Sequence, residues 1–250
     1  MSAAQTAEVM SPGLSKVVER ARRHPDAVFH SLAHLIDVEA LRRAFARLRA
    51  DAAVGVDGVT KEQYAQDLEA RLLDLHARLR AGRWRHQPIR RVHIPKPDGR
   101  TRPLGISALD DKLVQSVLAE LLGAIYEQDF RDCSYGFRPG RSAHQALRAL
   151  RTTMQNNEGN WLLEADIRSF FDSVDRAALW EMLQRRVADG ALLRLLGKCL
   201  HVGVLDGAQY SAPEQGTVPT RCAVRPGNRL VRKEDRSRSR AEILLIVQRV

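Results

Sequence analysis

The chain has 250 residues, of which 44% are hydrophobic, so it is long enough to bury a core and is not a disordered protein. Its three cysteines, Cys133, Cys199 and Cys222, lie far apart without metal-ligand spacing, which argues against a disulfide framework and against a zinc site. The formal net charge of +10 favours a polyanionic partner, although residues 220–250 alone supply six of these charges.

The first eighty residues are predicted to be mainly helical. Residues 1–30 contain a short helix from Leu14 to Arg23 and give no functional signal. Apolar residues at three- and four-residue spacing predict an amphipathic helix over 31–50, and Thr60 with Gln63 forms a capping box for the next helix. The sequence has neither a basic start with an apolar core nor an apolar run of membrane-spanning length. We therefore expect a cytoplasmic protein without membrane contact.

A basic β-hairpin is predicted next. From Arg80 to Arg102 the chain has eight basic residues and one acid, Asp98. Residues 89–94 alternate basic and apolar side chains, residues 95–100 have strong turn chemistry, and residues 101–106 form a second extended run. Lysine and arginine on such a hairpin are suited to binding phosphates, although a solvated charged surface is an equally good interpretation of the composition.

The next elements are again mostly helices. Ser107 and Asp110 are predicted to form a capping box for a strongly apolar helix. Residues 133–142 form a loop with two glycines and two arginines, and its final serine caps another helix. Two further helices and a short hairpin with Asp206-Gly207 at its turn complete this part of the chain.

Residues 161–172 are the strongest candidate for a catalytic segment. A short apolar run of strand length ends abruptly at Asp166 and is followed by an aromatic turn. A carboxylate fixed at a strand end suits Mg²⁺, which prefers oxygen ligands. Strand-end aspartates are also common in ordinary sheets, so these residues alone leave the metal site open.

Five motifs occur in one order along the chain, and together they resemble the bacterial group II intron reverse transcriptases of the maturase type. The resemblance covers about residues 30–219. The motifs are Ala-Val-Gly-Val-Asp-Gly-Val at 53–59, Ile-Pro-Lys-Pro-Asp-Gly-Arg-Thr-Arg-Pro-Leu-Gly-Ile at 94–106, Tyr-Gly-Phe-Arg-Pro-Gly-Arg-Ser at 135–142, Asp-Ile-Arg-Ser-Phe-Phe-Asp at 166–172 and Gln-Gly-Thr at 215–217.

This resemblance implies an α+β right-hand polymerase fold, with fingers and palm built from helices around an antiparallel sheet. It implies Mg²⁺ as cofactor, with Asp166 as the catalytic, metal-binding carboxylate and the carbonyl of Ile167 as a further ligand. Lys96 and Arg102 match residues that hold the triphosphate, and Phe171 matches the residue that excludes a ribose 2′-hydroxyl. Gln215 and Gly216 complete the nucleotide site.

The implied partners are RNA, as intron or template, a DNA primer and deoxynucleoside triphosphates. The basic hairpin combines a charge cluster with a rigid turn, which favours it as the main nucleic-acid contact. The candidate nucleic-acid-binding residues, from the hairpin cluster and the arginine-containing loop, are Arg83, Arg85, Arg90, Arg91, Arg138 and Arg141.

The sequence departs from the family pattern after Pro219. The family continues with a Tyr-Ala-Asp-Asp hairpin that adds two metal-binding carboxylates, whereas residues 220–250 are basic and without periodicity. We therefore expect an incomplete palm and a truncated protein that is inactive alone, since neither Glu164 nor Asp172 is a good substitute. The expected division is an N-terminal extension (1–30), a helical region (31–82), a partial fingers and palm domain (83–219) and a largely disordered tail (220–250).

Two other functions remain open at this point. The first is a non-catalytic fragment that binds intron RNA and assists its folding and splicing. The second is a pseudogene product without function. Retron and diversity-generating reverse transcriptases are a weaker alternative lineage, because the stretch at 135–142 is more similar to the group II type.

Overall fold

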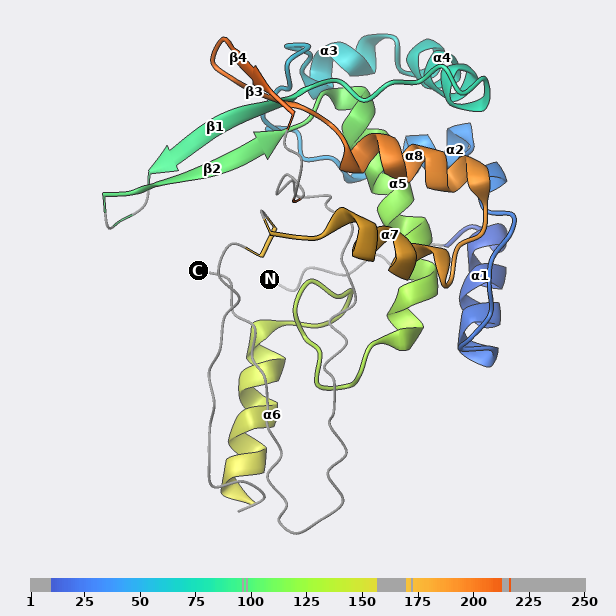
Figure 1. The fold of residues 1–250 in the computed structure, drawn as a ribbon, viewed down its shortest axis with the longest axis vertical. Helices are drawn as coiled ribbons and strands as arrows, with labels where there is room; N and C mark the ends of the chain where they lie inside the picture. Colours follow the sequence, from blue (N-terminus) through green and yellow to red (C-terminus); the bar gives the residue numbers. More distant parts are fainter. Residues whose placement is uncertain are drawn as a thin grey trace.

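The computed structural model describes residues 10–95, 97, 99–156, 170–171, 173–212 and 216, and it combines helices with a mixed sheet (Figure 1). The helices are α1 (Pro12–Arg23), the 3-10 helix η1 (Ala33–Leu35), α2 (Val38–Arg47), α3 (Lys61–Gln66), α4 (Leu68–Arg80), α5 (Leu109–Tyr126), the 3-10 helix η2 (Glu127–Asp129), α6 (Ala143–Gln155), α7 (Arg176–Gln184) and α8 (Gly190–Leu200). The strands are β1 (Ile89–Pro95), β2 (Thr101–Ile106), β3 (Val204–Asp206) and β4 (Gln209–Ser211).

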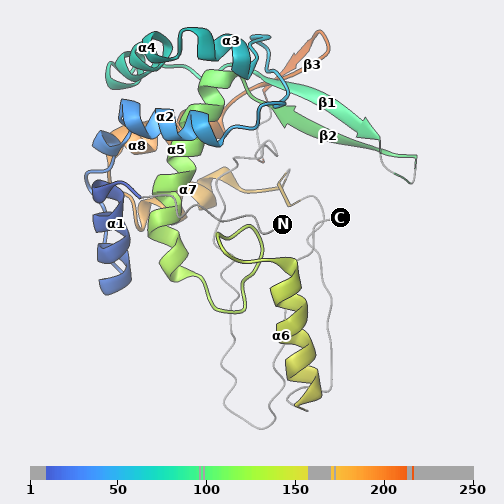
Figure 2. The same cartoon turned by 180° about the vertical axis from the view of Figure 1, so that it is seen from behind.

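Helix α5 is the centre of the helical body. Its leucines, valines and isoleucine are buried, and α1 and α2 both pack against it. Figures 1 and 2 show α1, α2, α7 and α8 arranged around it from opposite sides. Such all-round burial explains why its sequence is apolar on more than one face. The core is also continuous from α1 onward, because Leu14, Val17 and Ala21 belong to the same buried cluster.

Two predicted helix N-termini, each specified by residues within a single helical turn, are confirmed. Thr60 and Gln63 form the predicted capping box of α3, and Ser142 caps α6. Two predicted helices were too long. The helix expected over 31–50 is reduced to α2, which begins after its N-cap Asp37, and the helix expected after Thr60 breaks at Asp67 into α3 and α4.

The predicted capping box at the start of α5 is wrong. The N-cap of α5 is Ala108, without a side-chain cap, and the Ser107 hydroxyl contacts Gln115 instead. A carboxylate from a distant loop takes over this role, because Asp57 Oδ2 accepts a hydrogen bond of 3.1 Å from the backbone N–H of Leu109. The loop approaches closely because Gly55 has no side chain, and a Cβ there would lie 2.5 Å from Ala108 Cα.

The sheet has the strand order β2-β1-β3-β4 and is mixed. The two predicted hairpins are present, since β1 pairs antiparallel with β2 and β3 pairs antiparallel with β4. A parallel pairing between β1 and β3 joins them, with Ile89 beside Val204 and Arg90 beside Leu205. The long β1–β2 hairpin extends away from the helices in both views (Figures 1 and 2).

Asp189 fixes the segment after α1 to the start of α8. Its Oδ2 accepts hydrogen bonds from the N–H groups of Leu32 (2.6 Å) and Ala33 (2.8 Å), while Oδ1 accepts from Ala191 and Leu192 at the N-terminus of α8. Burial alone would raise the pKa of this carboxylate. The four N–H donors outweigh burial and lower its pKa. Across the described residues, no helix is both long and apolar enough to cross a membrane.

Candidate nucleic-acid and nucleotide interface

The arginines of the hairpin do not share one face. Side chains alternate along a strand, and cross-strand partners lie on the same face. Arg102, which pairs with Ile94, therefore lies on the face of Arg90, whereas Arg91 lies on the other. Arg90 donates from both Nε (3.1 Å) and NH2 (2.7 Å) to the carbonyl of Val54, so it holds the loop before α3. Of this group, Arg102 is exposed near the turn of the hairpin.

Arg83 and Arg85 lie just before β1 and are both exposed. Between them Trp84 is buried at 1% exposure, and its carbonyl accepts a hydrogen bond of 2.6 Å from Lys198 Nζ of α8. The anchored tryptophan thus fixes the backbone from which the two arginines extend. No ion pair of either side chain occurs within the described residues. This pair is therefore an accessible part of the predicted basic cluster.

Arg138 and Arg141 are engaged within their own loop. The Arg138 side chain is only 7% exposed, contacts Glu127 at 2.8 Å and donates from NH1 to the carbonyls of Arg131 and Ser134. Arg141 donates to Asp132, and its guanidinium lies 5.5 Å from the centroid of the Tyr135 ring. Arg138 therefore organises the loop, and Arg141 retains partial exposure of 30%.

Two of the predicted nucleotide-site residues are placed near the start of α7. Phe171 makes an edge-on contact with Phe170, with ring centroids 5.2 Å apart. Gly216 is buried; its N–H donates to the carbonyl of Val174 (3.1 Å), and its carbonyl accepts from Arg176 Nε (2.8 Å). The structure thus brings Gly216 to the segment that follows Phe170 and Phe171, a proximity that no sequence spacing signals.

Several predicted site residues lie outside the described residues: Asp166, Ile167, Lys96, Gln215 and the alternative carboxylates Glu164 and Asp172. Within the described ranges, no three His, Cys, Asp or Glu residues are grouped so as to hold a metal ion. The metal site and its ligands therefore stay predictions.

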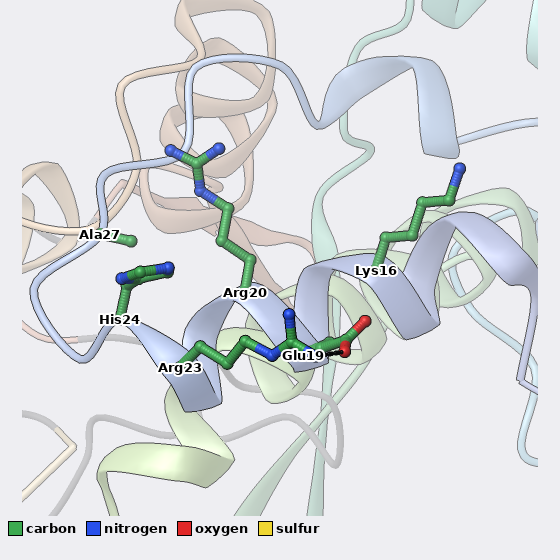
Figure 3. Close-up of a pocket in the computed structure, with 6 residues that line it drawn as sticks. All are labelled: Lys16, Glu19, Arg20, Arg23, His24 and Ala27. Atoms are coloured by element: carbon green, nitrogen blue, oxygen red, sulfur yellow. Dashed lines mark ion pairs between the residues drawn. The ribbon is translucent and has the colours of Figure 1, made fainter.

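Sequence analysis missed a basic groove on α1. It has a volume of about 520 Å³ and is lined by Lys16, Glu19, Arg20, Arg23, His24 and Ala27. In Figure 3 Lys16 and Arg20 extend from the helix in the same direction, whereas Arg23 lies along the helix and forms an ion pair with Glu19. Arg20 also lies 5.7 Å above the ring of Phe29. The three- and four-residue spacing of these basic residues was the signal available in the sequence.

A buried polar network lies beneath the hairpin where it meets α5. Asp111 Oδ2 accepts from the N–H of Gln87 (3.0 Å), and His86 contacts the side chain of Gln115 (2.7 Å). Burial raises the pKa of Asp111 to about 7, and burial lowers the pKa of His86. Both side chains are almost inaccessible, at 1% and 2%, so the network serves the fold rather than a ligand.

Comparison with known proteins identifies the family. Residues 94–227 match the family model described as reverse transcriptase (RNA-dependent DNA polymerase), which is more than half of the chain. The chain belongs to the reverse transcriptase family. The group II intron type expected from the five motifs is confirmed, since the chain is 30% identical over 206 residues to the group II intron-encoded protein LtrA of Lactococcus lactis subsp. cremoris.

The relatives are much longer than this chain. The match to LtrA covers 82% of this chain and 34% of LtrA. Protein YkfC of Escherichia coli (strain K12) is 39% identical over 165 residues, covering 65% of this chain and 43% of YkfC. A chain of the partial Cas6-RT-Cas1–Cas2 complex matches with a TM-score of 0.41 and 20% identity, over 73% of this chain and 31% of that chain. The expected α+β reverse-transcriptase fold is confirmed by the family match together with the observed elements.

Proposed function

We propose that this chain forms the nucleotide- and template-binding part of an RNA-directed DNA polymerase of the group II intron type. Its partners are an RNA, a DNA primer and deoxynucleoside triphosphates. The observation that carries this proposal is the contact of Gly216 with Val174 and Arg176. It connects Gly216 of the Gln-Gly-Thr motif to residues that closely follow the motif at 166–172, which supports the assignment of both motifs to one nucleotide site.

The donor types assigned to the metal site fit Mg²⁺. The Asp166 carboxylate and the Ile167 carbonyl are hard oxygen ligands, which this ion prefers. The chemistry that such an ion supplies is neutralisation of triphosphate charge and activation of the primer hydroxyl. Lys96 and Arg102 hold the triphosphate through charge-assisted hydrogen bonds, and Phe171 limits the space beside the ribose.

Binding of RNA without catalysis is the second candidate function, in which the chain assists the folding and splicing of an intron RNA. A separate observation favours it. The exposed pair Arg83 and Arg85 and the basic groove on α1 lie outside the nucleotide motifs, and basic side chains of this kind bind phosphodiester backbones without regard to sequence.

Binding of a fluorescent deoxynucleoside triphosphate in the presence of Mg²⁺ separates the two functions. For the polymerase proposal, Asp166→Ala and Arg102→Ala should each weaken binding at least about tenfold. Arg91→Ala on the opposite face of the hairpin is the charge-matched control and should bind normally. Equal affinity of the wild-type chain and Asp166→Ala would leave only the RNA-binding function.

Primer extension tests the catalytic step itself. Residues 1–250 contain no Tyr-Ala-Asp-Asp motif, so this 250-residue chain is expected to add no nucleotide to a primer on an RNA template. Incorporation that Asp166→Ala abolishes would contradict this expectation and would assign the remaining ligands to other carboxylates, such as Asp172 or Glu164.

A further inference from the structure

Among the described residues, the rest of the sheet pairs with the β1–β2 hairpin only at its base. Strand β3 pairs with β1 at Ile89 and Arg90, although β1 continues to Pro95. Figure 1 shows β3 and β4 beside the first part of the hairpin, while the remainder extends away from the helices. Arg102, which we assign to the triphosphate, pairs with Ile94 near the far end. Its position therefore depends on what holds the hairpin beyond Arg90.

A carboxylate from β3 makes a contact further along β1. Asp206 Oδ2 accepts a hydrogen bond of 3.1 Å from His93 Nε2. Arg91 NH1 is 3.8 Å from the same oxygen, which is too long for a hydrogen bond. Asp206 lies two residues beyond Val204, whose partner on β1 is Ile89. Alternation along the two strands therefore places Asp206 on the face of Arg91 and His93, and its carboxylate reaches past the last backbone pairing towards the far end of the hairpin.

The backbone that carries Asp206 is well ordered by its own hairpin. Asp206 is the last residue of β3, and it pairs with Gln209, the first residue of β4. The two residues between them form the turn, in which Gly207 has a φ of 59°. A two-residue turn with glycine at its first position is a regular connection of two antiparallel strands. The carboxylate is thus presented to His93 from a fixed base.

The contact connects the two described parts of the proposed nucleotide site. On one side, His93 pairs across the hairpin with Pro103, which directly follows Arg102. On the other side, β4 ends at Ser211, a few residues before Gly216 in the sequence. The hairpin that presents Arg102 is therefore held by the strand pair that precedes Gly216.

This ion pair contributes little to the stability of the fold. The His93 side chain is 48% exposed and the Asp206 side chain is 39% exposed, and ion pairs at such exposure have small net effects on folding. A two-stranded hairpin without further support is only marginally ordered, however, so one additional contact changes where its far end lies. The position of the hairpin is thus the property that this contact controls.

We propose that Asp206 is a positioning residue for triphosphate binding, which acts through His93 on the hairpin that presents Arg102. This inference rests on the proposed nucleotide-binding function. The charge of Asp206 makes the direction of the effect informative. Removing a carboxylate near a triphosphate site would by electrostatics alone strengthen binding. A weaker affinity after its removal therefore reports the position of the hairpin and not the change of charge.

The test measures binding of a fluorescent deoxynucleoside triphosphate, in the presence of Mg²⁺, by the 250-residue chain. Asp206→Ala and His93→Ala should each weaken binding about threefold, and the double variant should bind no more weakly than either single variant. Exchanging the two residues, by combining His93→Asp with Asp206→His, should restore the wild-type affinity. A separate structural role of either residue would not allow this restoration.

The effect should also depend on Arg102. In a chain that already carries Arg102→Ala, Asp206→Ala should change the affinity by less than about twofold. Asp74→Ala is the matched control, because Asp74 is an exposed aspartate that pairs with Arg78 on α4, and it should bind normally. Thermal unfolding of each variant within about 2 °C of the wild type would show that a loss of affinity does not come from misfolding.

Unchanged or stronger binding by Asp206→Ala would overturn the positioning role alone, and so would a full threefold loss in the Arg102→Ala background. Absence of triphosphate binding by the wild-type chain would overturn the proposed nucleotide site and this role together. If Asp206→Ala unfolds at a lower temperature, His93→Ala and the exchanged pair decide the question in its place. Wild-type affinity of His93→Ala, or no recovery in the exchanged pair, would then overturn the positioning role.

Discussion

The carboxylate of Asp57 caps a helix that begins 52 residues later in the sequence, by accepting a hydrogen bond from the N–H of Leu109. This contact gives a structural role to the Ala-Val-Gly-Val-Asp-Gly-Val motif at 53–59. The motif holds the N-terminus of the central helix α5, against which α1 and α2 pack.

Removing this cap is expected to destabilise the protein. Asp57→Ala leaves the Leu109 N–H without its acceptor and should lower the free energy of unfolding by about 1 kcal/mol, whereas Asp57→Asn retains an acceptor and should lose less. Urea unfolding measures the change. Asp67→Ala is the control, because Asp67 precedes α4 without making a side-chain cap. Equal losses in the two alanine variants would contradict the role of Asp57.

Replacing two glycines by alanine should change the stability of the protein in opposite directions. Gly55 lies against the start of α5, and Gly123 lies within α5. Gly55→Ala places a Cβ 2.5 Å from Ala108 Cα, and relieving that clash should cost about 1–3 kcal/mol of stability. Gly123→Ala meets nothing within 4 Å inside α5 and should stabilise the protein by roughly 0.5–1 kcal/mol. Thermal unfolding of both variants is the measurement. A neutral Gly55→Ala would mean that the loop does not approach α5 this closely.

Stability should fall with rising pH because of Asp111. Its pKa in the folded protein is about 7, above its ordinary value of 3.8, so the folded state holds this proton more tightly than the unfolded state. The contribution is complete below pH 3.8 and is lost as the pH rises through 7. Relative to Asp111→Asn, the wild-type protein should lose up to about 1.4 kcal/mol per pH unit in this interval.

The comparison with Asp111→Asn removes the titration of this carboxyl group. The lowered pKa of His86, whose Nδ1 lies 3.4 Å from Asp111 Oδ2, acts in the opposite direction. Burial is the main cause of the raised pKa of Asp111, and the carboxylates of Asp110 and Asp57 add to it while Arg78 opposes it. Urea unfolding at several pH values would contradict the prediction if the wild-type and Asp111→Asn profiles were parallel.

The exposed arginines before β1 should dominate the salt dependence of RNA binding. Replacing both Arg83 and Arg85 by Glu should weaken RNA binding and reduce the slope of log affinity against log salt by about two. Fluorescence anisotropy over a salt series measures this slope. Arg90→Gln is the control, because both of its donors go to the Val54 carbonyl. It should lower stability by about 1 kcal/mol and leave the slope unchanged. We would conclude that Arg90, and not Arg83 and Arg85, contacts RNA if Arg90→Gln reduced the slope and the double variant left it unchanged.

The features that sequence analysis predicted correctly depend on residues close together in the chain. The capping boxes at Thr60 and Ser142 act within one helical turn, and the two hairpins are specified by turns between adjacent strands. The cap on α5 was assigned to Ser107 because that residue was adjacent, whereas the residue that acts is remote. The parallel pairing of β1 with β3 was missed for the same reason.

In the candidate site, too, features that depend on neighbouring residues were predicted, whereas contacts between distant residues were not. Alternation along β1 indicates that Arg90 and Arg91 lie on different faces, but it does not show which face meets the Val54 loop. The sequence identified Arg138 as a basic residue in a loop. It did not indicate that the Arg138 side chain is buried against Glu127, because that contact depends on the path of the chain. The family motifs predicted Gly216 as a site residue, whereas its contact with Arg176 depends on the fold of the chain.

The bonds from Leu32 and Ala33 to Asp189 also determine when the N-terminal region is able to fold during synthesis. Their acceptor lies 157 and 156 residues downstream, and at roughly 5–20 residues per second its translation takes on the order of ten seconds. Until then these two N–H groups have no carboxylate acceptor, and Phe29 has no Val187 to pair with. Residues 29–33 are thus synthesised well before their partners, and they reach these contacts only after residues 187–189 have left the ribosome.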